Sequence, residues 1–399
     1  MTFPSNVEPS SREVFAIINV LKESIARYET APENTKALED ILSASGKLGR
    51  ATADPQALLR RFNFQPLQNA CVRIAIEMQL FEKLPVSKSF TCQELAISGG
   101  YDVEFTTRIV RGLAAGDVLE EVGESTYRQT RLSRLWARPE ARDYTIHQWE
   151  NFQTPIWSSI DYFRKFGFQS PTDPRNSPIT FAMGGRDKSL FDILEEEPRR
   201  LEIFKNAMKS LAVPVSAYRF DKLQPGRDDI LLVDVGGGRG HTIQEICSSY
   251  PNINGRLVLQ DLKGTFNELK TDEFDGRVEF QPYNFLEGIQ PVQGAAAYLY
   301  KLVFHDWSDA YCHRILANLA PSMSRNSRLL ICDKILPERS PDSHHVLSDI
   351  NMLFIAGKER TGTEWSQLLD KAGYVLTKIH WLSKPGYGMI EAALKEASF

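Results

Sequence analysis

The hydrophobic pattern is clearest in the second half of the chain, where short apolar runs alternate with amphipathic stretches. Buried strands are predicted for five apolar runs, at 230–235, 256–261, 278–282, 296–303 and 327–333. Helices are predicted between them, for example at 242–250 and 308–323, because apolar residues recur on one helical face. This alternation is typical of a doubly wound parallel sheet. The closing segments KIHWL and GMIEAAL, separated by SKPGY, predict an antiparallel pair at the sheet edge.

The first half of the chain has a mostly helical pattern. Residues 13–29 carry apolar positions at helical spacing, which predicts an amphipathic helix that packs on a partner surface. From 64 to about 137, three short helical stretches precede two short strands around Gly123, the outline of a winged helix. Residues 140–215 are rich in aromatic side chains, which form core or build pockets for flat ligands.

These patterns predict three parts in a chain of 399 residues. A helical and winged-helix domain, suited to dimerisation, is expected at 1–140. An aromatic-rich helical linker that contributes to a substrate pocket is expected at 141–215. A sheet domain is expected at 216–399. The predicted fold class is therefore α/β, a doubly wound Rossmann-like sheet with an antiparallel edge strand, preceded by a mostly helical domain.

Charge and composition narrow the choice of partners. Lys and Arg number 47 against 51 Asp and Glu, so the formal charge is −4, and the third helix of the winged-helix outline offers only Arg108 and Arg111. Nucleic-acid binding is therefore not favoured. No apolar run is long enough to cross a bilayer, and the opening residues lack the features of a secretory signal. We expect a cytoplasmic protein that acts on a small molecule. The five scattered cysteines, without CxxC spacing, predict no disulfide and no metal site.

Residues 231–242, LLVDVGGGRGHT, join an apolar strand to a glycine-rich turn that opens a helix. Such a turn lets a ligand approach the backbone and the N–H groups of the helix. A dinucleotide fingerprint would need glycine at His241, and a P-loop would need Gly-Lys-Ser/Thr, so both are disfavoured. The motif is instead D-x-G-x-G-x-G from Asp234, with Asp261 at the end of the next strand. An acid before the turn suits a cationic amino group and an acid at the second strand suits a ribose diol, which indicates S-adenosylmethionine.

Residues from about 61 to 399 carry further motifs, in an order that resembles class I S-adenosylmethionine-dependent O-methyltransferases of the plant and fungal caffeate and flavonoid type. The matching stretches are LLVDVGGGRG, RLVLQDL, AYLYKLVFHDWSDAYCHRIL, LLICDKILPE, LSDINMLFIAGKERTGTEWSQLLDKAGY and the closing hairpin. The resemblance implies that 216–399 is an S-adenosylmethionine-binding catalytic domain. It also implies a homodimer whose N-terminal helices are exchanged between subunits.

The resemblance implies a set of residues around the cofactor, namely Asp234, Gly236, Gly238, Gly240, Asp261, Asn284, Phe285 and Lys301. The three alternate glycines would surround the methionine part, and Asp261 would bind the ribose. Asn284 and Phe285 would lie beside the adenine, and Lys301 where cofactor and substrate meet. Asn284 departs from the family, which usually has Asp, so we expect weaker binding of the adenine amino group.

His305, in FHDW, follows a predicted strand end, where doubly wound sheets expose functional side chains. Phenols have a pKa near ~10, so methyl transfer to oxygen benefits from a base of pKa near ~6 to 7, which imidazole provides. By resemblance, Asp333 and Glu359 orient the ring and stabilise imidazolium. Asn351 and Met352 match positions that line the acceptor pocket. No metal is required for this reaction.

Three functions remain open from the sequence. The first is an O-methyltransferase that acts on a phenolic or enolic metabolite, in fungal secondary metabolism, with His305 as the general base. The second is a pericyclase on the same scaffold, as some fungal relatives are, with Lys301 and His147 contacting the substrate. His147 also fits ordinary packing. The third, a DNA-binding regulator, is disfavoured by the acidic charge balance.

Overall fold

The computed structural model describes residues 11–185, 187–210, 213–339, 341 and 343–395. The chain divides into two compact units, Met1–Trp136 and Ala137–Phe399, which are described separately. The predicted boundaries at 140 and 215 remain predictions. None of the helices in the described ranges combines the length and the apolar character that a membrane span needs.

The first unit is mostly helical, with one small sheet. Its helices are α1 (Ser11–Thr30), α2 (Thr35–Thr52), α3 (Pro55–Glu77), α4 (Leu80–Lys83), α5 (Cys92–Gly99), α6 (Val103–Ala115) and α7 (Ser133–Trp136). Strands β1 (Phe90–Thr91), β2 (Leu119–Gly123) and β3 (Thr126–Gln129) pair antiparallel in the order β1-β3-β2. Thr91 and Glu94 form a capping box that starts α5. Tyr127 of β3 is completely buried in the core of this unit.

The second unit is built on an eight-stranded sheet. Its strands are β4 (Ile230–Val235), β5 (Arg256–Asp261), β6 (Val278–Pro282), β7 (Ala297–Lys301), β8 (Arg328–Leu336), β9 (Arg360–Thr361), β10 (Tyr374–Trp381) and β11 (Tyr387–Leu394). The order is β10-β11-β8-β7-β4-β5-β6, and β9 pairs with β8. Strands β4 to β8 are parallel, whereas β10 and β11 run antiparallel. The antiparallel pair is confirmed, with β10 at the edge and β11 inside it.

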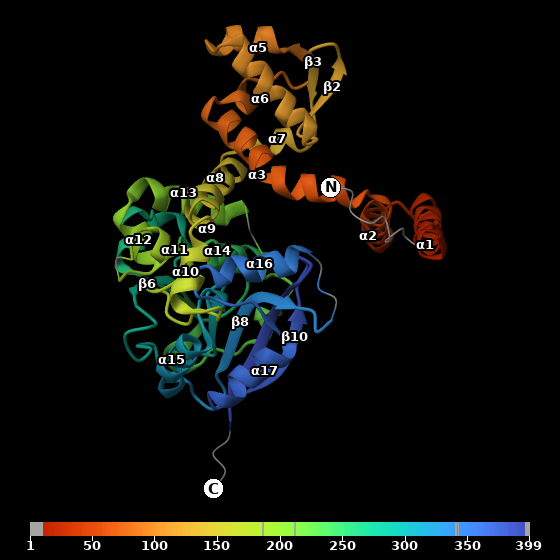
Figure 1. Cartoon of the computed structure of the whole chain (residues 1–399). Coiled ribbons are helices and arrows are strands. Elements are labelled where there is room, and N and C mark those ends of the chain that lie inside the picture. The colour runs from red at the N-terminus through yellow and green to blue at the C-terminus, as the bar shows by residue number, and fades with distance from the viewer. Residues whose placement is uncertain (1–10, 186, 211–212, 340, 342, 396–399) are drawn as a thin grey trace. The chain divides into compact units, whose positions relative to one another are not determined.

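Helices cover this sheet and fill the segment before it. They are α8 (Pro139–Gln148), the π-helical turn η1 (Trp149–Gln153), α9 (Thr154–Ile156), α10 (Ser159–Phe166), α11 (Pro178–Ala182), α12 (Leu190–Glu196), α13 (Pro198–Ser210), α14 (His241–Ser249), α15 (Asp309–Leu319), α16 (Ser343–Leu353) and α17 (Gly362–Lys371). Short 3₁₀ turns lie at Phe220–Lys222, Arg227–Asp229, Lys263–Glu268, Thr271–Glu273, Phe304–Asp306 and Ala320–Ser322. Helix α17 packs against β10 (Figure 1).

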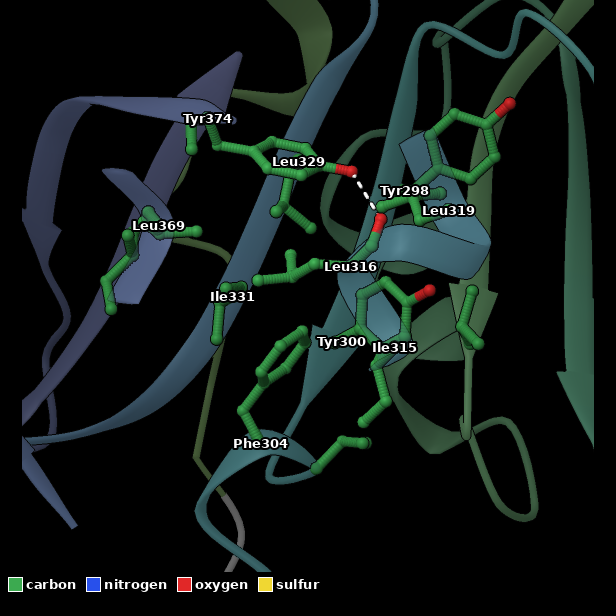
Figure 2. Packing of buried hydrophobic residues seen from close by; sticks show 14 of the residues in the cluster. Tyr298, Tyr300, Phe304, Ile315, Leu316, Leu319, Leu329, Ile331, Leu369 and Tyr374 are labelled. Atoms are coloured by element: carbon green, nitrogen blue, oxygen red, sulfur yellow. Dashed lines mark hydrogen bonds between the residues drawn. The ribbon is translucent and has the colours of Figure 1, made fainter. Parts of the chain in front are cut away.

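Packing of α15 on the sheet fixes the segment that carries His305. Helix α15 buries Cys312, Ile315, Leu316 and Leu319, the face that its sequence predicts. Figure 2 shows Leu316 among residues of β7 and β8, and the Tyr374 hydroxyl donates a hydrogen bond of 2.9 Å to its carbonyl oxygen. A helix held at several points cannot slide along the sheet. The turn between β7 and α15 is therefore held at both ends.

Strand β7 ends earlier than its hydrophobic run predicts. The sequence predicts a strand to 303, but Leu302 has a φ of 54°, in the left-handed region that a Leu side chain rarely adopts. Its N–H still donates to the Cys332 carbonyl oxygen at 2.9 Å, so the chain turns while remaining attached to β8. This strained residue turns the backbone into the 3₁₀ turn Phe304–Asp306.

Candidate active site

The glycine-rich turn lies at the carboxyl ends of the central strands, between β4 and α14. Gly236, Gly238 and Gly240 have φ values of 70°, 58° and 76°, which glycine adopts without strain. The N–H groups of Gly236 and Gly237 donate to the Gln260 carbonyl oxygen at 2.8 and 3.1 Å. A side chain at Gly238 would meet no atom within 4 Å. The turn is therefore supported from the side of β5 and open at Gly238, as a site for a backbone-bound ligand requires.

Asp261, at the end of β5, is attached directly to this turn. Its Oδ2 accepts from the Gly238 N–H at 2.8 Å, and its Oδ1 accepts from the Leu262 N–H at 2.8 Å and the Thr265 hydroxyl at 2.7 Å. Three donors fix the carboxylate in one orientation. Each oxygen has further capacity to accept, so the group suits a ribose diol.

The Asp234 carboxyl group lies beneath the glycine-rich turn. It is completely buried, and neither carboxyl oxygen has a hydrogen-bond partner among the described residues. A Cβ at Gly237 would lie 2.5 Å from its Oδ2, so the carboxyl group is beneath the turn rather than at its rim. Burial raises the pKa of Asp234 to about 7, against the nearby charge of Lys301. Its role in cofactor binding stays a prediction.

Lys301, Asn284 and Phe285 surround the same strand ends. The Lys301 Nζ, at the end of β7, donates to the Thr242 hydroxyl on α14 at 3.3 Å. The Phe285 ring packs edge-on near Tyr300 and Trp307, and a Cβ at Gly236 would lie 3.4 Å from it. The Asn284 Oδ1 accepts from the Leu286 N–H at 3.0 Å. Phe285 therefore lies beside the turn and Lys301 contacts the helix that follows it, and the roles of all three residues toward the cofactor stay predictions.

His305 lies in the 3₁₀ turn after β7, with 17% of its side chain exposed. Its Nδ1 lies 3.2 Å from the Glu359 Oε1, and its Nε2 lies 3.6 Å from the Asp306 Oδ1. A carboxylate only accepts, so Nδ1 carries the proton in this pair. The structure therefore brings together His305 and Glu359, which are 54 residues apart.

Three carboxyl groups control the charge of the His305 ring. Burial lowers the pKa of His305, but the charges of Asp306, Glu359 and Asp333 outweigh burial and raise it to about 10. Burial is also the largest influence on Glu359, but the charge of His305 and the hydrogen bonds from His305 and Ser348 hold its pKa below the ordinary value. The cluster therefore favours imidazolium beside a carboxylate.

Asp333 contributes to this cluster through its charge alone. It is completely buried on β8, and neither of its oxygens has a hydrogen-bond partner among the described residues. Burial raises its pKa to about 7, and the charge of His305 opposes that rise. Glu359 contacts the ring directly, whereas Asp333 acts on it through its charge, and the predicted role of Asp333 stays a prediction.

Sequence reasoning missed Asp306 and Arg360, although each adjoins a predicted residue. Arg360 is completely buried and donates to the carbonyl oxygens of Phe304, Trp307 and Lys358 at 2.9 to 3.3 Å, and to the Asp309 carboxylate. It therefore fastens the turn that carries His305 to the segment that carries Glu359. The sequence FHDW placed Asp306 beside His305, a signal that could have been used.

The predicted substrate residues lie on α8 and α16. His147 is buried, its Nδ1 lies 2.8 Å from the Asn151 Nδ2, and its ring contacts Phe152 and Phe204. Burial lowers the pKa of His147 to about 4, so the ring is neutral. Met352 belongs to a buried cluster that includes Phe152, and Asn351 is half-buried beside it. Among the residues described, no group of three or more His, Cys, Asp or Glu side chains could hold a metal ion.

Sequence comparison identifies the family. An O-methyltransferase domain model matches residues 175–375, and an O-methyltransferase dimerisation domain model matches residues 65–139. O-methyltransferase penK of Penicillium thymicola is 32% identical over 362 residues, covering 89% of this chain and 83% of that protein. O-methyltransferase asqD of Emericella nidulans is 33% identical over 342 residues, covering 82% and 87%. This chain belongs to the O-methyltransferase family.

Solved structures of similar fold agree with membership of the O-methyltransferase family. OxaC, in complex with sinefungin and meleagrin, has a TM-score of 0.86 at 26% identity, covering 96% of this chain and all of that one. LepI, in complex with SAM, has a TM-score of 0.85 at 25% identity with the same coverage. A protein described as a pericyclic reaction enzyme, at 24% identity, shares the fold. The predicted mixed α/β fold with a helical N-terminal region is thereby confirmed.

Proposed function

We propose that this protein transfers the methyl group of S-adenosylmethionine to a hydroxyl of a phenolic or enolic small molecule, in fungal secondary metabolism. The observation that carries the proposal is the partly exposed His305 ring, hydrogen-bonded through Nδ1 to Glu359 at 3.2 Å. Its other nitrogen, Nε2, lies 3.6 Å from the Asp306 Oδ1 and would face the oxygen of the acceptor. Membership of the O-methyltransferase family supports this reading.

The residues at the strand ends fit the cofactor. Asp261 is held by three donors with acceptor capacity left for a diol, and Gly238 faces open space on the glycine turn. Phe285 would lie against the adenine, and Lys301 would lie near the methionine part. S-adenosylmethionine supplies an electrophilic methyl group on a cationic sulfur. The chain itself contributes binding, alignment and the position of one proton.

His305 would act on the acceptor proton through its raised pKa. A neutral phenol beside neutral imidazole and a phenolate beside imidazolium differ only in the position of one proton. The carboxyl groups of Asp306, Asp333 and Glu359 favour the second arrangement, because they raise the pKa of the ring to about 10. The oxygen that accepts the methyl group would therefore carry negative charge, which makes it a better nucleophile.

Incubation of the purified protein with methyl-labelled S-adenosylmethionine and a panel of phenols and pyridones tests this function. We expect label in at least one product, and a loss of about 100-fold or more in His305→Gln, in line with general-base catalysis. The matched control is His380→Gln, because His380 pairs with Glu391 on the sheet and lies outside the site. Calorimetry must find the cofactor still bound to the His305 variant. A fully active His305→Gln protein would contradict the base assignment.

A second candidate function, a pericyclase, rests on His147. Its ring is neutral and buried beside aromatic side chains, so it would orient a polar substrate without charge. Lys301 would supply the positive charge. Under this reading the panel gives no labelled product although the cofactor binds, and a substrate analogue shifts the NMR resonances of the His147 ring. Labelled product excludes it as the main activity.

We also propose a homodimer, supported by the match of residues 65–139 to a dimerisation domain. Light scattering with size-exclusion chromatography tests it. A mass near twice 45.2 kDa is expected, and a monomer at micromolar concentration would contradict it.

A further inference from the structure

Helix α16 carries a hydroxyl that contacts the catalytic cluster. The Ser348 Oγ donates to the Glu359 Oε1 at 2.8 Å, and this is the same oxygen that lies 3.2 Å from the His305 Nδ1. The other oxygen, Oε2, is buried and has no hydrogen-bond partner among the described residues. One carboxylate oxygen therefore receives both the serine hydroxyl and the imidazole.

The neighbouring residue on α16 holds the backbone of Glu359. The Asp349 Oδ1 accepts from the Glu359 N–H at 3.0 Å. Two consecutive residues of one helix thus hold the main chain and the side chain of Glu359. The Glu359 side chain is only 1% exposed, so water cannot replace a lost partner without entering the site.

We propose that Ser348 is a positioning residue that holds Glu359 in the orientation needed to align the His305 ring. A carboxylate can rotate about its terminal bond, and the hydrogen bond from Ser348 selects the rotamer in which Oε1 faces Nδ1. Without the hydroxyl, the Glu359 carboxylate is free to rotate about its terminal bond. Oε1 then moves away from the His305 Nδ1, and the hydrogen bond between them breaks. Only the catalytic consequence of this inference rests on the proposed function.

Helix α16 also carries residues predicted to line the acceptor pocket. Ser348 precedes Asn351 and Met352 by three and four positions on the same helix, so all three share one face. Met352 lies in the buried cluster with Phe152. The helix expected to contact the acceptor is thus the helix that orients the carboxylate behind His305.

Two variants of equal shape isolate the hydroxyl. Ser348→Thr keeps it and Ser348→Val removes it, while both add the same branched bulk. The readout is the Nδ1–H resonance of His305 in ¹⁵N-histidine-labelled protein, assigned by its loss in His305→Gln. A hydrogen bond to a charged group contributes about 1.5 to 3 kcal/mol, so its removal increases opening, and hence exchange with water, about tenfold or more. This measurement needs no substrate.

We expect slow exchange in Ser348→Thr and in the control Ser343→Ala, an exposed position at the start of α16. We expect fast exchange in Ser348→Val. If the valine variant does not fold, Ser348→Ala takes its place. Exchange as slow in the variant without the hydroxyl as in wild type would overturn the inference.

A rate measurement extends the test once an acceptor is known. Ser348→Val is expected to lower kcat about 3- to 10-fold relative to Ser348→Thr, with the KM for S-adenosylmethionine unchanged. If His305→Gln keeps full activity, the proposed base fails while the exchange result still decides the role of Ser348. If His305→Gln is inactive and the two Ser348 variants are equal in rate and exchange, the positioning role alone is wrong.

Discussion

The glycine-rich turn and the His305 cluster lie at the same end of the sheet but are built in different ways. The turn is local: Asp234 to Gly240 fold on themselves, and the bonds that their backbone makes to a neighbouring strand go to Gln260 and Asp261 at the end of β5. The His305 cluster takes residues from the turn after β7, from β8, from α16 and from the segment before β9. The first site depends on backbone conformation, whereas the second depends on side chains that tertiary packing brings together.

The largest expected effect comes from removing the side chain that joins the parts of the second site. Arg360→Met leaves the carbonyl oxygens of Phe304, Trp307 and Lys358 without this donor in a buried place. We expect a loss of about 3 to 5 kcal/mol in the free energy of unfolding and at least 100-fold in methyl transfer. Denaturant unfolding and rate measurements check both. In the control, Arg256→Met, an exposed pair with Glu279 is lost at a cost of about 0 to 1 kcal/mol. Equal costs for the two variants would contradict the joining role.

Each of the two regions contains a buried carboxyl group, and replacing the two groups should change stability in the same way but activity differently. Asp234 and Asp333 are both completely buried without hydrogen-bond partners among the described residues, and burial raises the pKa of each to about 7. Between pH 4 and 7 the folded protein holds these protons and the unfolded chain does not, so stability falls as pH rises through this range. Replacement by Asn removes the effect.

We therefore expect Asp234→Asn and Asp333→Asn to raise the free energy of unfolding at pH 8 by about 4 kcal/mol each, because burial raises each pKa from its ordinary value of 3.8 to about 7. Their activities should diverge. Asp333→Asn removes charge that favours imidazolium and should lower kcat about 10-fold or more, whereas Asp234→Asn should leave kcat unchanged at saturating cofactor. Unfolding curves at pH 5 and pH 8, with rates, test the pair. A wild-type kcat in both variants would contradict a role of the Asp333 charge in catalysis.

The glycine turn offers a comparison between backbone strain and lack of space. Gly238→Ala introduces a side chain into open space at φ 58°, whereas Gly240→Ala at φ 76° places its Cβ 2.6 Å from Phe274 and 2.9 Å from Leu259. Gly238→Ala should lower the free energy of unfolding by about 1 kcal/mol, because alanine is strained at this φ. The second adds a clash, so we expect at least a further tenfold loss of S-adenosylmethionine affinity by calorimetry. Equal losses of affinity in the two variants would mean that the contacts with Phe274 and Leu259 add nothing to the effect of backbone strain.

The same contrast explains what the sequence could predict. The strands, the antiparallel pair and the glycine turn depend on patterns within about 10 to 20 residues, and these patterns were sufficient. Ser348 and Arg360 were not recognisable, because their roles come from contacts with Glu359 and the turn at 304–307, which only the folded chain creates. The early end of β7 was also hidden, since Leu at position 302 favours a strand and tertiary packing imposes its φ of 54°.

The smallest expected effect is at Asn284, where the family usually has Asp. It tests whether this single difference from the family weakens cofactor binding. The Asn284 Oδ1 already accepts from the Leu286 N–H at 3.0 Å, so one lone pair of this oxygen is left for the adenine amino group, and Nδ2 can only donate. In Asn284→Asp, one oxygen can keep the Leu286 bond while the other accepts from the adenine. We expect S-adenosylmethionine to bind about 3- to 10-fold more tightly, as one added hydrogen bond provides. Asn326→Asp, at an exposed position, adds the same charge and serves as the control in the same titration. Unchanged affinity in Asn284→Asp would place the adenine away from this side chain, and the cofactor region would then depend on its backbone and Asp261 alone.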